Sequence, residues 1–491
     1  MSQSLRAIAA LLAAIAFVAG CATRPINPPT AEYEPDKTYR IERPSDNTED
    51  NATLVVLAFS GGGTRAAAFS YGVLETLRDM EVQTRSGRHI RALDTVDVIT
   101  GISGGSFTAL AFGLYGDRLF DVYEAAFLKR DVQGELLRRA LNPFNWPALG
   151  STGWGRSELA ADMYDEILFK GATSKDLRRD GPRILVSATD LADGTRLIFN
   201  PENFDVLCTD LSSIRLARAA AASSAVPVVL SSITLDNHGG TCGYKLPSWA
   251  NMFLDNPDPP RPASRTVKRL QELQAFADRE TRRYIHPVDG GVSDNVGMRG
   301  VLDVLSTFEA LHAAGLKTPY DHVRNIYILV VNSLATPPND WGLRENPPAL
   351  FDVLIKATGT PIDRYSYDTV ETLRDIQARW ASLREIRDAI KPYPELRAKL
   401  GAVMRAPDIN IRVVEVSFST LSDKAERDYL NTLPTSFVLD GESVDRLRGA
   451  ARDAILASPE IKRLIANGAL RMVGPGPRVG PSSGAASRPK Q

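Results

Sequence analysis

The sequence has almost no net charge, few cysteines and no Walker-type phosphate loop. Its formal charge is -1 over 491 residues, whereas proteins that bind polyanions normally concentrate a basic excess on one face. We therefore expect no nucleic-acid partner. A chain of this length with three cysteines is not a small disulfide-stapled scaffold. No Gly-Lys-Ser or Gly-Lys-Thr follows the glycine-rich stretches, which excludes a Walker-type nucleotide site. We expect neither a metal nor a cofactor.

The N-terminal residues resemble a bacterial lipoprotein signal. Arg6 precedes an apolar run that ends in Val-Ala-Gly-Cys at Cys21. The run is short for a bilayer span, and small residues before a cysteine are typical of cleavage and lipid attachment at its thiol. We expect residues 1–20 to be a removed signal peptide and Cys21 to anchor the protein in the cell envelope. Ala22 favours the outer membrane, facing the periplasm. An uncleaved membrane anchor is the alternative.

The remainder of the chain divides by composition. With 43% hydrophobic residues, a chain of this length can bury a large core. Residues 21–51 are rich in proline and polar residues, which suits an extended tether. Residues 52–335 alternate buried-strand and helix patterns and predict an α/β domain. Residues 336–472, with one strand at 409–418, predict a mainly helical region packed on that domain, and residues 473–491 predict a disordered tail.

Two cysteines lie within the predicted α/β domain. Cys208 and Cys242 are 34 positions apart, and an oxidising periplasm permits them to pair. We expect a disulfide between them, with two buried free thiols as the alternative.

A Gly-x-Ser-x-Gly sequence is the central feature of the chain. The β-branched run 97–100 leads into Gly101-Ile-Ser-Gly-Gly, and a helical pattern follows at 107–115. A strand, a sharp turn and a helix in this order form the context of a nucleophile elbow. Gly101 and Gly105 leave room for a strained turn that projects the Ser103 hydroxyl at the positive end of the helix. Ser103 is therefore the candidate nucleophile, and a Gly/Ser-rich loop is the alternative.

A second glycine-rich turn precedes the elbow. The apolar run 52–59 predicts a buried parallel strand, and Ser-Gly-Gly-Gly-Thr-Arg follows it. The unobstructed amides of Gly61, Gly62 and Gly63 form a cradle for an anion. A dinucleotide site is one interpretation, but the next strand ends in the serine turn instead of the acidic residue that binds ribose. An oxyanion hole accounts for both turns together.

The candidate base lies much further along the chain. Asp289 follows an apolar segment at 284–288 and precedes Gly290 and Gly291. Two glycines after an aspartate at a strand end allow another backbone or a substrate to approach its carboxylate. By itself the sequence is an ordinary turn. An upstream nucleophile that needs a base makes Asp289 the leading candidate.

A long irregular segment separates the two parts of this predicted site. Residues 236–285 combine Pro, Gly and Asn with scattered aromatic residues and end in a charged helix. This segment is a candidate lid or membrane contact. An ordinary insertion is the alternative.

Five landmarks in series resemble the patatin-like phospholipase family. They are the Ser-Gly-Gly-Gly-Thr-Arg loop, the elbow, the Asp-Gly-Gly sequence, Ser-Ala-Thr-Asp at 187–190 and Ala-Ala-Ala-Ala-Ser-Ser-Ala-Val-Pro at 219–227. The resemblance covers about residues 52–332, and Ala66 departs from it because the family usually has glycine there. It implies a three-layer α/β/α sandwich with a mostly parallel sheet. It also implies a Ser103-Asp289 dyad served by the glycine amides.

The resemblance implies hydrolysis of fatty acyl esters of phospholipids or lysophospholipids. Membrane lipids are then both the substrate and the anchoring surface, and we make no prediction of a protein partner. An acyltransferase or thioesterase with the same acyl-serine step is an alternative. A noncatalytic envelope lipoprotein that keeps the fold as a binding module is another.

A histidine base is the main chemical alternative to Asp289. α/β-Hydrolases order their triads as Ser, acid and His, and two histidines follow Ser103 in that order after an acid. However, Ser60 stands where those enzymes typically carry the histidine of their oxyanion loop. We expect a structural role for His286, and Arg65 either binds a phosphate head group or anchors the glycine loop. The histidines are His89, His238, His286, His312 and His322.

Overall fold

The computed structural model describes residues 23–34 and 52–474, apart from 152, 228, 258–263, 319 and 338–340. The predicted signal peptide, Cys21, most of the predicted tether and nearly all of the predicted tail lie outside these residues. No helix among the described residues is both long and apolar enough to cross a membrane.

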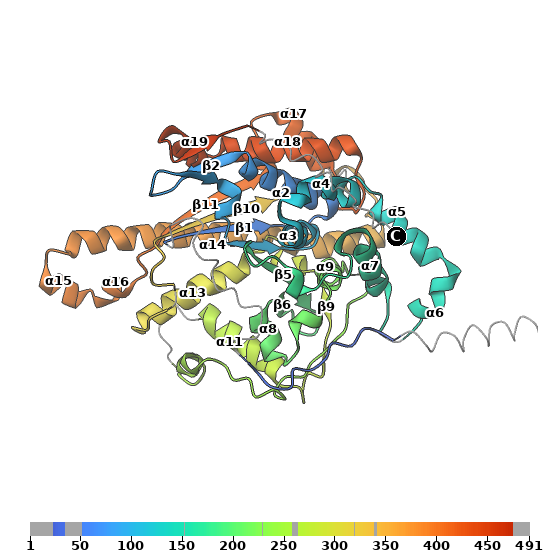
Figure 1. The fold of residues 1–491 in the computed structure, drawn as a ribbon, viewed down its shortest axis with the longest axis horizontal. Helices are drawn as coiled ribbons and strands as arrows, with labels where there is room; N and C mark the ends of the chain where they lie inside the picture. Colours follow the sequence, from blue (N-terminus) through green and yellow to red (C-terminus); the bar gives the residue numbers. More distant parts are fainter. Residues whose placement is uncertain are drawn as a thin grey trace, which may run out of the picture.

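A seven-stranded, mostly parallel sheet forms the centre of the molecule (Figure 1). Five strands run parallel to one another, and β6 and β9 pair antiparallel with β5. In the order β11-β10-β1-β4-β5-β6, with β9 beside β5, the strands are Asn410–Ser417, Asn325–Asn332, Thr53–Phe59, Val98–Gly101, Arg183–Asp190, Arg196–Phe199 and Pro287–Val288.

Helices cover both faces of this sheet, because its strands are apolar on both sides. In β1, Leu57 and Phe59 pack into one core, and Val56 and Ala58 pack into the other, as the alternation of side chains along a strand requires. The first core holds α2, α3, α9 and α18, and the second holds α13 and α14. Figure 1 shows α2 and α18 above the sheet and α13 below it. The predicted three-layer α/β/α sandwich is confirmed. These helices are Gly63–Arg78, Gly104–Tyr115, Leu216–Ser223, Gly441–Ala457, Arg299–Ala313 and Leu350–Ile390.

The strand register brings the predicted site loops to one edge. Phe59 at the end of β1 pairs with Gly101 at the end of β4, and with Val331 near the end of β10 on its other side. The glycine loop and the elbow leave these adjacent parallel strands at the same level. Parallel α/β sheets place their sites at this edge.

The C-terminal part of the chain is continuous with the sheet. The strand expected at 409–418 forms as β11, which pairs in parallel with all eight residues of β10. The helix α18 packs against α2 and shares its core. The C-terminal end of α14 forms a projection at the left of Figure 1, together with α15 (Pro394–Lys399) and α16 (Gly401–Arg405).

Smaller elements complete the described fold. Cys208 and Cys242 are joined by a disulfide. The described residues of the segment 236–285 include α10 and α11, and the segment ends in β8, which pairs with β7. The remaining strands β2, β3, β7, β8 and β12 are Met80–Gln83, His89–Arg91, Leu235–Asp236, Tyr284–Ile285 and Leu470–Met472. The remaining helices α4 to α8, α10 to α12, α17 and α19 are Leu119–Tyr123, Val132–Leu141, Trp146–Leu149, Arg156–Tyr164, Pro201–Val206, Asn251–Leu254, Ser264–Ala277, Gly291–Asp294, Lys424–Thr432 and Pro459–Ala466.

Candidate active site

Ser103 occupies a strained turn between β4 and α3. Its φ of 47° and ψ of -120° are rare for a residue with a side chain, and such strain is characteristic of functional positions. The two flanking glycines are sterically required. A Cβ on Gly101 would lie 2.8 Å from the Cα of Ser106, and one on Gly105 would lie 2.7 Å from the Cβ of Phe59. The serine is 5% exposed.

Asp289 lies at the end of β9 in the same buried region. Its Oδ1 accepts a hydrogen bond of 2.7 Å from the Gly291 amide, and the residue is 7% exposed. Burial raises the pKa of Asp289 to about 6, while hydrogen bonding from the Gly291 amide and the Ser103 hydroxyl partly offsets that rise. The Ser103 hydroxyl thus lies close enough to Asp289 to lower the pKa of its carboxyl, although the two residues are 186 positions apart in the sequence.

Ser223 holds the serine turn and the aspartate turn together. Its hydroxyl accepts a 2.9 Å hydrogen bond from the Ser103 amide and donates one of 2.7 Å to the carbonyl oxygen of Ser187. Its own carbonyl oxygen accepts the Gly290 amide at 3.1 Å. Sequence reasoning recognised the stretches containing Ser187 and Ser223 as family landmarks but gave neither residue a role.

The glycine loop differs from the prediction at its first residue. The Gly61 amide donates a 2.9 Å hydrogen bond to the carbonyl oxygen of Asn295, so it is not free to bind an oxyanion. The amides of Gly62 and Gly63 have no partner among the described residues. Both residues have positive φ, of 139° and 61°, a conformation that glycine adopts without strain. The predicted set of three donors is therefore corrected to two.

The glycine loop is pressed against the elbow and against the C-terminal segment 433–437. A Cβ on Gly104 would lie 2.0 Å from the Gly63 carbonyl oxygen, and one on Gly63 would lie 2.2 Å from that of Ser436. The Thr64 amide also donates a 2.8 Å hydrogen bond to the Ser436 carbonyl. These close approaches fix the two free amides beside the first turn of α3.

Arg65 anchors this loop. Its guanidinium donates hydrogen bonds to the carbonyl oxygens of Ser333 at 2.9 Å and Leu433 at 2.7 Å, and to the Thr435 hydroxyl at 3.0 Å. Burial lowers the pKa of the Arg65 guanidinium to about 10. The sequence suggested that Arg65 either binds a phosphate head group or anchors the glycine loop, and these contacts support the second role.

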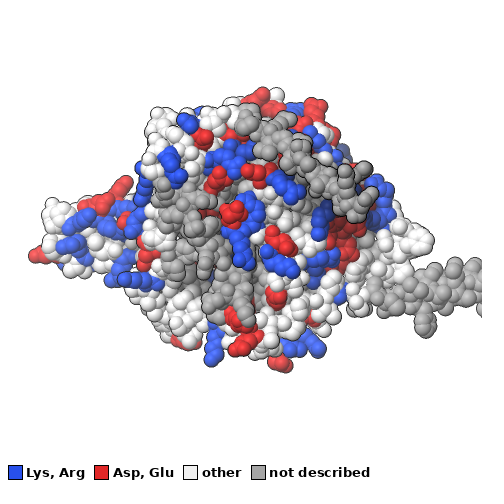
Figure 2. Space-filling view, in the orientation of Figure 1, with Lys and Arg blue, Asp and Glu red and all other residues white. Residues whose placement is uncertain are grey.

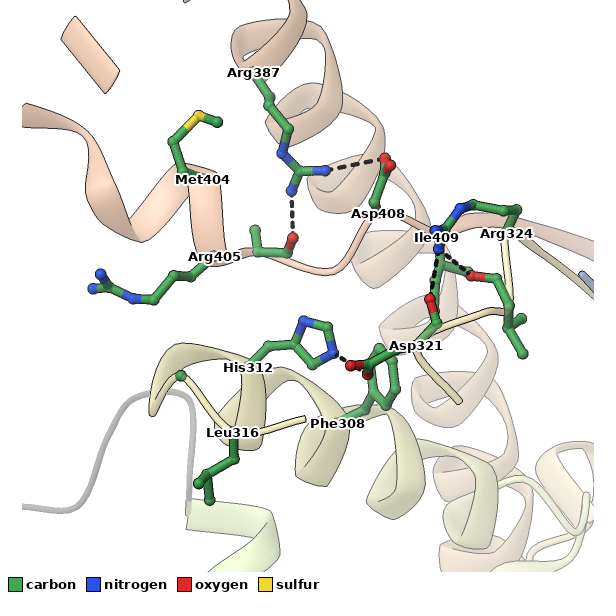
Figure 3. A pocket seen from close by; sticks show the side chains of 13 residues that line it. Phe308, His312, Leu316, Asp321, Arg324, Arg387, Met404, Arg405, Asp408 and Ile409 are labelled. Carbon is green, nitrogen blue, oxygen red and sulfur yellow. Dashed lines mark hydrogen bonds and ion pairs between the residues drawn. The ribbon is translucent and has the colours of Figure 1, made fainter. Parts of the chain in front are cut away.

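Three histidines have side-chain partners other than Ser103 and Asp289. His286 Nδ1 is 3.2 Å from the Thr234 hydroxyl, and His238 Nε2 is 3.0 Å from the Asn27 carbonyl oxygen. His312 lies 3.0 Å from Asp321 in a groove of about 450 Å³ between α13 and α16 (Figure 3). Within the described part of the chain, no group of three or more His, Cys, Asp or Glu residues could hold a metal ion.

Comparison with known proteins identifies the family. The sequence matches the family described as "Patatin-like phospholipase" over residues 57–302, which is half of the chain. Human GIVD cytosolic phospholipase A2 has a similar structure, with 12% identity and a TM-score of 0.39, over 87% of this chain and 64% of that one. Its complex with methyl gamma-linolenyl fluorophosphonate gives 13% identity and a TM-score of 0.38, over 86% and 59%. The chain thus spans less than two thirds of that relative.

No curated protein matches the sequence significantly. The residues matched by the family include the glycine loop, the elbow, the stretch with Ser223 and the Asp289 turn. The chain belongs to the patatin-like phospholipase family.

Proposed function

We propose that this protein is a lipid acyl hydrolase in which Ser103 is the nucleophile and Asp289 the general base. Membership of the family supports lipid hydrolase chemistry in general. The observation that carries the specific assignment is that a strained, buried serine lies close enough to a buried carboxylate to affect its pKa, which burial raises to about 6.

The raised pKa explains how a carboxylate replaces the usual histidine. A serine hydroxyl attacks an ester only when a base takes its proton as the bond forms. An aspartate at its ordinary pKa of about 3.9 is a weak base, and a base is most effective when its pKa lies near the working pH. Burial raises the pKa of Asp289 and so brings it closer to the working pH. The carboxylate still remains ionised above about pH 6.

The reaction then proceeds in two balanced steps. Ser103 Oγ bonds to the acyl carbon while Asp289 takes the hydroxyl proton, and the tetrahedral intermediate expels the alcohol, which receives that proton from Asp289. In the second step Asp289 takes a proton from water, the hydroxide adds to the acyl carbon, and Ser103 leaves with the proton. The products are a free fatty acid, the alcohol and the original enzyme.

The amides of Gly62 and Gly63 are the proposed oxyanion donors. They lie at the start of α2, where the helix dipole also favours negative charge. Removing one such donor from an acyl-transfer enzyme typically raises the barrier by about 3 to 4 kcal/mol. The close approach of Gly63 to Gly104 holds these amides beside the turn that carries Ser103.

We further propose that the substrate is a fatty acyl ester of a phospholipid or lysophospholipid. We also propose that Cys21 carries a lipid anchor in the outer membrane, facing the periplasm. The family and the signal-like N-terminus support these two statements. An acyltransferase or thioesterase would use the same acyl-serine intermediate and would differ only in the acceptor or in the bond that is cleaved.

Fatty-acid release from defined lipids tests this proposal. The panel contains a phosphatidylcholine, a phosphatidylethanolamine, their lysophospholipids, a triacylglycerol and an acyl thioester, each with and without an added alcohol acceptor. We expect release from the phospholipids or lysophospholipids by the wild type and none by Ser103→Ala. Transfer to the acceptor in place of release would favour the acyltransferase, and turnover by folded Ser103→Ala would refute the nucleophile.

A further inference from the structure

Helices α5 and α6 expose a cluster of large apolar side chains near one end of the molecule. Leu137 and Leu141 lie one turn apart on α5 and share a face, and both are exposed. Phe144 lies in the connection to α6 and is 91% exposed, and Trp146 is the first residue of α6 and is 56% exposed. We call these four residues the α5–α6 apolar surface. Single exposed apolar residues need no explanation, but a cluster marks an interaction site.

Hydrogen bonds hold this surface in place. The Trp146 indole donates to the carbonyl oxygen of Ala140 at 3.2 Å, and the Asn145 side chain donates to that of Arg139 at 2.8 Å. The Phe144 amide is capped by Asn142 Oδ1 at 3.1 Å. The aromatic rings are therefore presented by an ordered turn.

The charged side chains of this projection lie on α5, and its outer tip is apolar. Figure 2 shows the outer tip of the projection formed by α5 and α6 in white, whereas the projection formed by α14, α15 and α16 at the opposite end carries many Lys, Arg, Asp and Glu side chains. Helix α5 itself carries Glu135, Arg138 and Arg139. A rigid Phe-Trp pair at an apolar tip suits the boundary between lipid head groups and acyl chains, where aromatic residues are enriched.

The start of the described chain contacts the segment that follows α6. The side chain of Arg24 packs on Gly153, where a built Cβ would lie 2.9 Å from Arg24 Cδ, and it pairs with Asp236 at 2.6 Å. Gly153 follows the end of α6 by four positions. Cys21 precedes Arg24 by three residues, which span at most about 10 Å. A lipid on Cys21 would therefore be held within about 10 Å of Arg24, near the segment that follows α6.

The α5–α6 apolar surface is also connected to the candidate active site. The Gln133 amide in α5 donates to the Phe437 carbonyl oxygen at 3.1 Å, and Gln133 Oε1 accepts the Phe437 amide at 3.1 Å. Phe437 follows Ser436, whose carbonyl oxygen binds the glycine loop. The helix thus starts at the segment that supports the oxyanion donors and leads outward to the exposed rings.

We propose that the α5–α6 apolar surface inserts into the bilayer that carries the Cys21 lipid and that it docks the active-site end of the protein on that membrane. The inference rests on the proposed lipid anchor and does not depend on catalysis. The lipid and the apolar surface provide two separate attachments, and a second attachment fixes an orientation that a flexible lipid anchor alone does not.

Quenching of tryptophan fluorescence by brominated lipid tests this docking. The full-length lipid-modified protein, in a Ser103→Ala background that preserves the vesicles, is reconstituted into vesicles of phosphatidylethanolamine and phosphatidylglycerol at 3:1. Part of the phosphatidylethanolamine carries bromine near the top of its acyl chains. Trp146→Phe is compared with the matched control Trp341→Phe, and Phe144→Ser is tested for its effect on Trp146.

We expect bromine to quench the wild type and the Trp341→Phe protein, and we expect Trp146→Phe to lose that quenching. Phe144→Ser should reduce the quenching of Trp146, because the loss of one aromatic ring that is buried in the bilayer weakens insertion about tenfold or more. Equal quenching in Trp146→Phe and Trp341→Phe would overturn the proposal. A self-associated protein with unquenched Trp146 would also overturn it and would assign the surface to a second copy. Because Ser103→Ala is inactive by design, neither result depends on hydrolysis.

Discussion

The backbone of Gly104 lies directly against the backbone of Gly63. A Cβ on Gly104 would come within 2.0 Å of the Gly63 carbonyl oxygen, which is closer than any real contact of that kind. The residue after the proposed nucleophile and a proposed oxyanion donor therefore share one small space. The distance between the attacking oxygen and the stabilising amides depends on the absence of a side chain at 104.

Gly104→Ala should consequently disable the enzyme. The methyl group must push the glycine loop away, and misplacement of one oxyanion donor lowers kcat by about 10²-fold or more. Initial rates of fatty-acid release provide the measurement. Gly449→Ala is the matched control, because no atom lies within 4 Å of a Cβ built there on α18. It should retain full activity, and a comparable loss in both variants would contradict the explanation.

Activity should rise with pH through about 6. Asp289 accepts the serine proton only when it is ionised, and burial raises its pKa to about 6. Below that pH, kcat/KM should fall about tenfold per pH unit, and above it kcat/KM should level off. A pH profile on a soluble short-chain ester measures the midpoint. Because a histidine base would titrate at a similar pH, His286→Ala is the control and should keep both the rate and the midpoint.

Asp289→Asn should lose activity and gain stability at neutral pH. The folded-state pKa of Asp289 lies above its unfolded value of 3.8, so the folded protein binds the proton more tightly than the unfolded chain does. Stability contributed by that proton is present below about pH 4 and is lost as the pH rises to about 6. Removing the charge should then recover up to about 3 kcal/mol above pH 6 and almost nothing below pH 4. Urea unfolding of both proteins at pH 4 and pH 7.5 tests the difference. If the variant is less stable than the wild type at pH 7.5, this result would contradict the claim that the buried Asp289 charge destabilises the folded protein.

Arg65→Gln should weaken both the fold and catalysis. The change leaves the carbonyl oxygens of Ser333 and Leu433 without their charged donor, and each buried acceptor left unpaired destabilises by about 1 to 3 kcal/mol. Urea unfolding and kcat are the two measurements. Arg463→Gln is the control, since that arginine is largely exposed and its ion-pair partner among the described residues is Glu460, and such surface pairs contribute about 0 to 1 kcal/mol. Full activity in Arg65→Gln would show that the loop needs no anchor.

Local sequence signals predicted the parts of the site that lie on one turn. The strand before Ser103, the flanking glycines and the helix after it are consecutive, and steric requirements alone select glycine at 101 and 105. The sheet could be anticipated from runs of apolar residues that are buried on both faces. The local sequence pattern also predicted the strand at 409–418, but it did not predict that this strand pairs with β10.

Contacts between distant segments could not be predicted in this way. Nothing near Gly61 indicates that its amide binds the carbonyl oxygen of Asn295, and this contact removes one of three expected oxyanion donors. Arg65 had two equally plausible roles until its partners at 333, 433 and 435 were known. Ser223 sits in an alanine-rich helix pattern whose sequence gives no sign of the hydrogen bond to the Ser103 amide. Backbone partners carry no residue-specific signal, so only the folded structure shows them.

The most direct measurement is the rate at which an alkyl fluorophosphonate labels the protein, followed by mass spectrometry of the labelled peptide. The account predicts one adduct, on Ser103, whose rate of formation rises with pH with a midpoint near 6 and falls sharply in Asp289→Asn. An adduct on another residue, or an undiminished rate in folded Asp289→Asn, would contradict the proposed dyad.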